Sequence, residues 1–115
     1  MSGFFDVHLG NMEVLFFHDG IEKFLYTIEE STRAKVIRCI MLLESYGQNL
    51  GMPHSKHIVE GIFELRVRGT QEIRILYIFH KRSVYLLHAF VKKTDRISRK
   101  DLEAARKRKK LVDDI

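Results

Sequence analysis

The sequence predicts an α+β domain in which an N-terminal strand and a helical hairpin pack on one face of an antiparallel sheet, in the order β-α-α-β-β-β-α. Two observations support this fold class. Apolar residues recur every three or four positions between residues 21 and 43, which indicates amphipathic helices. From Ile62 onward they alternate in twos, which indicates strands. Helices grouped before a run of strands are typical of a two-layer α+β arrangement.

Length and composition exclude several classes of protein. The chain has 115 residues, which suits one domain, and 45% hydrophobic with 30% charged residues is a usual soluble balance. No apolar run approaches the ~20 residues of a bilayer helix, and the N-terminal segment lacks the pattern of a signal peptide. The one cysteine, Cys39, allows no internal disulfide. We therefore expect a protein without a membrane partner that stays in the cytoplasm.

The N-terminal half predicts a strand and two helices. Residues 1–11 show little periodicity and are interpreted as a leader or extension without an assigned role, ahead of a single domain at 12–115. A strand is expected over Glu13–Phe17, followed by a helix capped by Asp19. A break at Ser31 and Thr32 separates it from a second helix, which should end near Gly47 because glycine tolerates positive φ. A loop is expected from about 47 to 60.

The C-terminal half predicts a three-stranded meander and a helix. Strands are expected over Ile62–Val67, Ile73–Phe79 and Val84–Val91, with a turn at 69–70 and a short polar connection at 80–83. Ser98 followed three residues later by Asp101 has the form of a capping box, so a short final helix should begin there.

Strand alternation gathers cations on the sheet face opposite the helical hairpin. It places Arg66 and Arg68 beside Glu64 in one strand, Arg74 in the next, and three residues of the last strand on the corresponding face: His88, Phe90 and Lys92. Cations interleaved with an aromatic ring are typical of an RNA-binding surface. The alternative is that Arg66 forms ordinary ion pairs with Glu64 or Glu72.

The charge is concentrated at the C-terminus. Residues 1–91 carry ten Lys/Arg and ten Asp/Glu, whereas residues 92–115 carry ten and five, so the last 24 residues hold the whole net charge of +5. Such a basic segment can bind a polyanion by releasing condensed counterions, which makes nucleic acid the first partner to consider. A solvated basic tail is the alternative.

Four segments carry a family resemblance: Phe63–Arg68 (FELRVR), Arg74–Tyr77 (RILY), Leu87–Thr94 (LHAFVKKT) and Glu103–Arg106 (EAAR). In this order and spacing they resemble the phage Gp49-like, HigB-type branch of the RelE/ParE toxin superfamily, over about residues 12–110. The resemblance implies a RelE-like fold and the toxin of a type II toxin–antitoxin system. It further implies an mRNA interferase, a ribosome-dependent endoribonuclease that inhibits translation. A helix-turn-helix, HigA-like antitoxin would neutralise it, and only that antitoxin would contact operator DNA.

Candidate catalytic residues follow from metal-independent RNA cleavage, in which the ribose 2′-hydroxyl attacks the neighbouring phosphorus. Arg66 and Arg74 suit stabilisation of the phosphorane charge, and the resemblance implies the same role. Proton transfer has three candidates, and which of them is base or acid stays open: His88, Lys92 and Lys93. The alternative for His88 is a half-buried strand histidine whose hydrogen bonds are satisfied by a neighbour.

Other residues receive supporting roles. Expected RNA contacts are Lys56, Arg68, Lys81, Phe90, Arg96, Arg99 and Lys100. No metal site is expected, because His54 and His57 lack a carboxylate or cysteine partner at a supporting spacing. No nucleotide cofactor is expected, because the chain has no glycine-rich phosphate loop.

Two other functions stay open at this point. ParE-like relatives of the same fold inhibit DNA gyrase by binding, without a catalytic group. A plain RNA-binding domain would bind RNA with steep salt dependence and leave it uncut.

Overall fold

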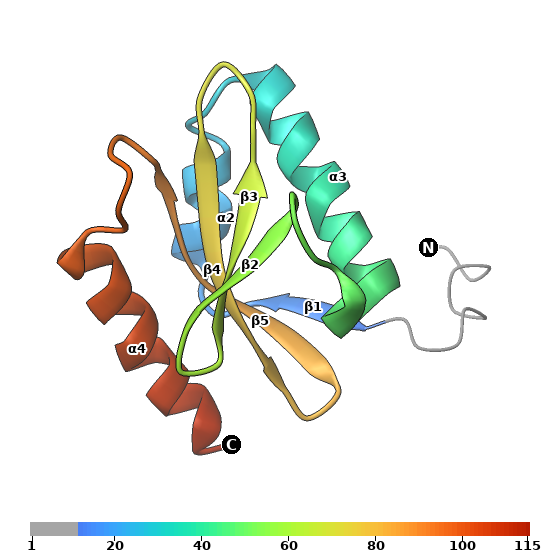
Figure 1. Cartoon of the computed structure of the whole chain (residues 1–115), viewed down its shortest axis with the longest axis vertical. Helices are drawn as coiled ribbons and strands as arrows, with labels where there is room; N and C mark the ends of the chain where they lie inside the picture. The colour runs from blue at the N-terminus through green and yellow to red at the C-terminus, as the bar shows by residue number, and fades with distance from the viewer. Residues whose placement is uncertain (1–11) are drawn as a thin grey trace.

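A computed structural model describes residues 12–115, so the expected leader at 1–11 lies outside the described residues. In Figure 1 the sheet lies between α3 on one side and α4 on the other. The elements are β1 (Glu13–Phe16), α2 (Asp19–Leu25), α3 (Glu30–Tyr46), a 3₁₀ turn (Gly47–Asn49), β2 (Ser55–Val59), β3 (Ile62–Val67), β4 (Ile73–His80), β5 (Ser83–Val91) and α4 (Arg99–Asp113). The predicted α+β class and its strand and helix order are confirmed.

The sheet has five strands in the order β1-β5-β4-β3-β2. The meander β3-β4-β5 is antiparallel as predicted. In contrast, β1 pairs with β5 in parallel, so the sheet is mixed rather than antiparallel. Strands β1 and β2 lie at opposite edges of the sheet, and the chain between them passes through α2 and α3.

The prediction of a loop from about 47 to 60 was wrong, because Ser55–Val59 forms the edge strand β2. The segment SKHIV lacks alternating apolar residues: Lys56 and His57 are both exposed, and a bulge separates His57 from Val59 in the pairing with β3. Ser55 is buried instead and hydrogen-bonds the Tyr77 hydroxyl. A polar residue therefore anchors this strand.

Two predicted helix boundaries also differ from the structure. The cap of α2 is His18 rather than Asp19, since the His18 Nδ1 accepts a hydrogen bond from the Gly20 amide at 3.0 Å. The break between the helices lies at residues 26–29, and Thr32 is buried in the first turn of α3 rather than separating the two helices. The predicted end of α3 near Gly47 is confirmed, with Gly47 at φ 53°.

The core has one apolar cluster on each face of the sheet. Helices α2 and α3 cover the first cluster, to which Val36, Leu43 and Leu65 contribute fully buried side chains. Helix α4 covers part of the second, where Ala105 and Val112 pack with strand residues such as Leu76. The face expected to be open is thus partly covered, and α4 is 15 residues long rather than short. Within residues 12–115, no helix has the length and apolarity that crossing a bilayer requires.

A fully buried side chain of the first cluster should contribute far more to stability than an exposed apolar side chain on α4. We predict that Leu43→Ala lowers the free energy of unfolding by about 3 kcal/mol, because it leaves a cavity at a side chain with 0% exposure. Leu111→Ala, at 57% exposure on α4, should change it by less than about 0.5 kcal/mol. Urea titration measures both, and equal losses would contradict this description of the core.

The cap of α2 should make stability depend on pH. Burial, and secondarily the Arg108 guanidinium, lowers the pKa of His18 below its ordinary 6.5. The unfolded chain then binds the proton more readily, so this group destabilises the fold as pH falls below about 6.5 and has no such effect above it. His18→Asn keeps a capping side chain and should reduce the loss of stability between about pH 7 and 5. An unchanged pH profile would contradict this prediction.

Candidate nucleic-acid interface

The strand register brings most of the predicted catalytic residues to one face, as expected. Arg66 in β3 lies directly opposite Arg74 in β4, which lies opposite Phe90 in β5. One pair further along β3, Glu64 lies opposite Leu76, which lies opposite His88. The two arginines are therefore cross-strand neighbours, and their like charges need a nearby anion.

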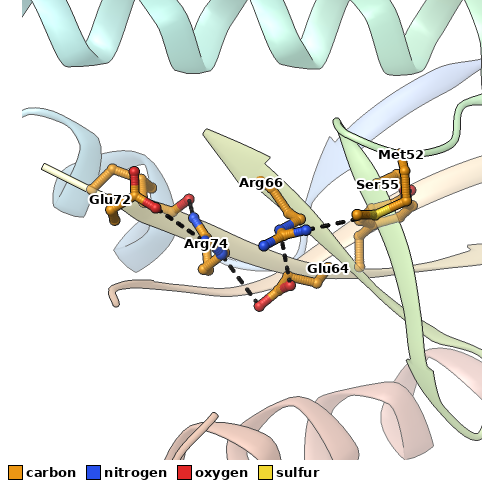
Figure 2. Close-up of polar contacts among 8 residues, drawn as sticks. Met52, Ser55, Glu64, Arg66, Glu72 and Arg74 are labelled. Atoms are coloured by element: carbon orange, nitrogen blue, oxygen red, sulfur yellow. Dashed lines mark hydrogen bonds and ion pairs between the residues drawn. The ribbon is translucent and has the colours of Figure 1, made fainter. Parts of the chain in front are cut away.

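Glu64 supplies that anion. Figure 2 shows its carboxylate between the two guanidinium groups, with Oε1 3.7 Å from the Arg66 Nε and Oε2 3.5 Å from the Arg74 Nε. Neither Nε makes a hydrogen bond of normal geometry, so these contacts are ion pairs. The sulfur of Met52 lies 3.6 Å from the Arg66 Nη1. The ion pair between Arg66 and Glu64, which the sequence offered as the alternative to an RNA-binding role for Arg66, is therefore present. We call Glu64, Arg66 and Arg74 the arginine cluster.

Arg74 is the buried member of the cluster, with 1% exposure. Its Nη2 donates to Glu72 at 3.1 Å and its Nη1 to the Ile73 carbonyl at 3.2 Å. Its charge is thus compensated by two carboxylates, and it presents no free fork to solvent. Arg66, whose side chain is 15% exposed, is the arginine that a ligand can reach.

His88 uses both ring nitrogens within the protein. Its Nε2 lies 2.7 Å from an Asp101 carboxylate oxygen, and its Nδ1 lies 3.2 Å from the Arg108 Nη1. Because a guanidinium only donates, the Nδ1 accepts and the neutral ring donates from Nε2. The ring also stacks on Phe90 at 5.7 Å between centroids. This geometry fits the alternative of a half-buried histidine, and it fastens α4 to β5.

The other predicted contacts are spread over the surface. Lys93, Arg96, Arg99 and Lys100 are exposed at or before the start of α4, and Lys92 is half-buried. Lys56 is exposed on the edge strand β2, opposite Glu64. Lys81 lies beyond the far end of β4 from Arg74, about 20 Å away along an extended strand, and donates to the Ile115 carbonyl. Lys81 therefore does not join the other residues.

A cavity of about 240 Å³ lies between α3, the segment before β2 and the end of β3. Five basic residues line it, and we call it the cationic cavity: Lys35, Arg38, His54, Arg66 and Arg68. No acidic residue is among the described residues that line it. The cavity shares Arg66 with the arginine cluster. Arg66 is the arginine of that cluster that a ligand can reach, so the cavity gives a ligand access to the cluster.

Sequence reasoning missed three residues of the cationic cavity: Lys35, Arg38 and His54. Lys35 and Arg38 are three apart on α3, so they share a helix face. The third residue, His54, comes from the segment before β2, and the sequence pattern does not show that this segment lies near α3. His54 was considered only as a metal ligand. Within residues 12–115, no three potential metal ligands gather.

Cys39 also borders the cationic cavity and is buried, with 8% exposure. Burial raises the pKa of this thiol, and the Arg38 charge only partly offsets that rise. The neutral thiol is a poor nucleophile, so Cys39 serves as an apolar wall.

A family model, described as phage derived protein Gp49-like (DUF891), matches residues 23–110. The chain belongs to this Gp49-like family, whose members are RelE/HigB-like toxin-type proteins. No match to a curated protein was found. The family model spans α3, β2 to β5 and most of α4, and thus every residue of the arginine cluster and the cationic cavity.

The arginine cluster should depend on its single buried carboxylate. We predict that Glu64→Gln lowers the free energy of unfolding by about 2 kcal/mol, because it leaves two neighbouring guanidinium groups with only Glu72 to compensate them. The matched change Glu103→Gln, in an exposed pair with Arg106, should cost less than about 0.5 kcal/mol. Denaturant titration at neutral pH compares them, and equal effects would show that Glu64 has no special role.

Proposed function

We propose that this Gp49-like protein is the toxin of a type II toxin–antitoxin system and acts as an endoribonuclease on mRNA at the ribosome. The observation that carries the proposal is the cationic cavity. Four cations and a histidine line it without an acidic residue among the described lining, and Glu64, the carboxylate that contacts Arg66, is itself buried, so the cavity favours a phosphate group. Membership of a toxin-type family supports the same function.

The chemistry proposed is attack of a ribose 2′-hydroxyl on the adjacent phosphorus, which leaves a 2′,3′-cyclic phosphate and a 5′-hydroxyl. Arg66 stabilises the charge that develops on the phosphorane oxygens, because Glu64 already orients its Nε side. Arg74 holds the opposite side of Glu64 and acts as a positioning residue. This mechanism needs no metal or cofactor.

In this proposal His54 accepts the proton of the 2′-hydroxyl and then, as the imidazolium, donates it to the departing 5′ oxygen. It is the histidine among the described residues of the cationic cavity, whereas both nitrogens of His88 are already engaged by Asp101 and Arg108. Lys92 and Lys93 directly follow β5, where they can contact the RNA backbone.

The proposed partners follow from the family and the charge. A helix-turn-helix antitoxin would cover the cationic surface and provide the contact with operator DNA. The ribosome would present mRNA, with ribosomal RNA bound by the exposed cations at the start of α4, Arg99 and Lys100. Such a protein works in the cytoplasm.

The test is inducible expression of the whole chain in bacteria, followed by mapping of mRNA 5′ ends. We expect new 5′-hydroxyl ends at a fixed position of the reading frame. Arg66→Ala should reduce them by about 100-fold or more, the scale of removing one electrostatic stabiliser of a transition state.

Arg82→Ala is the matched control, because it removes the same charge from an exposed site in the β4–β5 turn and should leave cleavage unchanged. Growth arrest without new ends would contradict the proposal and favour inhibition of DNA gyrase. RNA binding without cleavage would show a non-catalytic RNA-binding domain.

A further inference from the structure

A second hollow of about 320 Å³ adjoins the cationic cavity. The two share Leu42 and His54 as lining residues, so they lie next to each other beside α3. The residues that belong to the second hollow alone are Tyr46, Asn49, Leu50, Gly51 and Met52, and we call it the tyrosine hollow. Its chemistry differs sharply from that of its neighbour, since none of these five side chains is charged.

The turn after α3 creates the tyrosine hollow. Tyr46 is the last residue of α3, and Gly47 at φ 53° turns the chain into a 3₁₀ turn that ends at Asn49. The chain then returns past Gly51 and Met52 toward β2. A side chain at Gly47 would be strained at this φ, and its Cβ would approach the Met12 sulfur to 2.9 Å. The return path therefore depends on a glycine.

The contents of the hollow suit a flat, partly polar ligand. Tyr46 is 57% exposed, so an aromatic ring faces solvent there, whereas Met52, 62% exposed, has its sulfur 3.6 Å from the Arg66 Nη1. Asn49 is exposed and carries both a donor and an acceptor on its side-chain amide. Aromatic rings stack on nucleobases, and amides pair with base edges.

We infer that the tyrosine hollow is a nucleobase subsite, which holds the base of the nucleotide whose phosphate enters the cationic cavity. The inference rests on the proposed function, since it assumes a single-stranded RNA ligand. The two hollows are adjacent, because both are lined by His54 and Leu42. One nucleotide can therefore place its phosphate in the cationic cavity and its base in the tyrosine hollow. The cationic cavity then provides affinity for any sequence, and the tyrosine hollow provides the preference for a base.

The experiment measures binding of the full-length protein to four 2′-O-methyl homopolymer oligonucleotides of equal length, which lack the attacking hydroxyl. Fluorescence anisotropy over a salt series gives the affinity and the salt slope for each. Tyr46→Ala should weaken the preferred oligonucleotide about tenfold, leave the salt slope unchanged and bring the four affinities together. Tyr46→Phe should retain the affinity, because the ring remains. Asn49→Ala should reduce the difference among bases with little loss of affinity.

Two controls separate the subsite from the cationic cavity. Tyr26→Ala removes another exposed tyrosine, 71% exposed after the end of α2, and should change nothing. Lys35→Gln with Arg38→Gln should reduce the salt slope and leave the order of base preference intact.

The outcomes distinguish the two proposals. If the wild-type protein binds RNA with a steep salt slope but Tyr46→Ala behaves like Tyr26→Ala, the nucleobase subsite is wrong and the proposed function stands. If the wild-type protein binds none of the four oligonucleotides, both the proposed RNA recognition and the proposed nucleobase subsite are wrong.

Discussion

The pairing of two arginines across β3 and β4 is the constraint on which the candidate site depends. Arg66 and Arg74 lie directly opposite each other, and only a carboxylate close to both relieves their repulsion. Glu64 does so from the same strand as Arg66, with 6% exposure. Its two oxygens contact the Nε sides of both guanidinium groups, so it compensates charge and sets orientation at once. Arg74 can be buried for this reason, and Arg66 remains within reach of a ligand.

Charge is distributed unequally between the two sides of the sheet. On α4, two cations have acidic partners: Arg106 contacts Glu60 and Glu103, and Lys109 contacts Asp113. The cationic cavity on the α3 side has no acid among its described lining residues. A phosphate group is attracted most where cations converge without carboxylates, and this supports the proposal that the RNA phosphate binds beside α3.

The sequence predicted the helices and strands whose apolar residues recur at a regular spacing, and it missed the features that depend on tertiary contacts. Alternation identified β3, β4 and β5 and placed Glu64, Arg66 and Arg74 on one face, because a strand has a period of two. It could not identify β2, whose exposed Lys56 and His57 interrupt the pattern. The cationic cavity was missed for a related reason. Lys35 and Arg38 lie on α3, His54 precedes β2 and Arg68 follows β3, and the tertiary packing that gathers them leaves no periodic signal.

The central claim is that phosphate binds in the cationic cavity, and the arginine side chains can report it directly. The decisive measurement is an NMR titration of the Nε–Hε signals of the protein with a short single-stranded RNA. The account predicts that the signals of Arg38, Arg66 and Arg68 shift together and saturate at one RNA concentration. If these signals stay in place while those of Arg96 and Arg99 shift, RNA binds at the start of α4 and the account is contradicted.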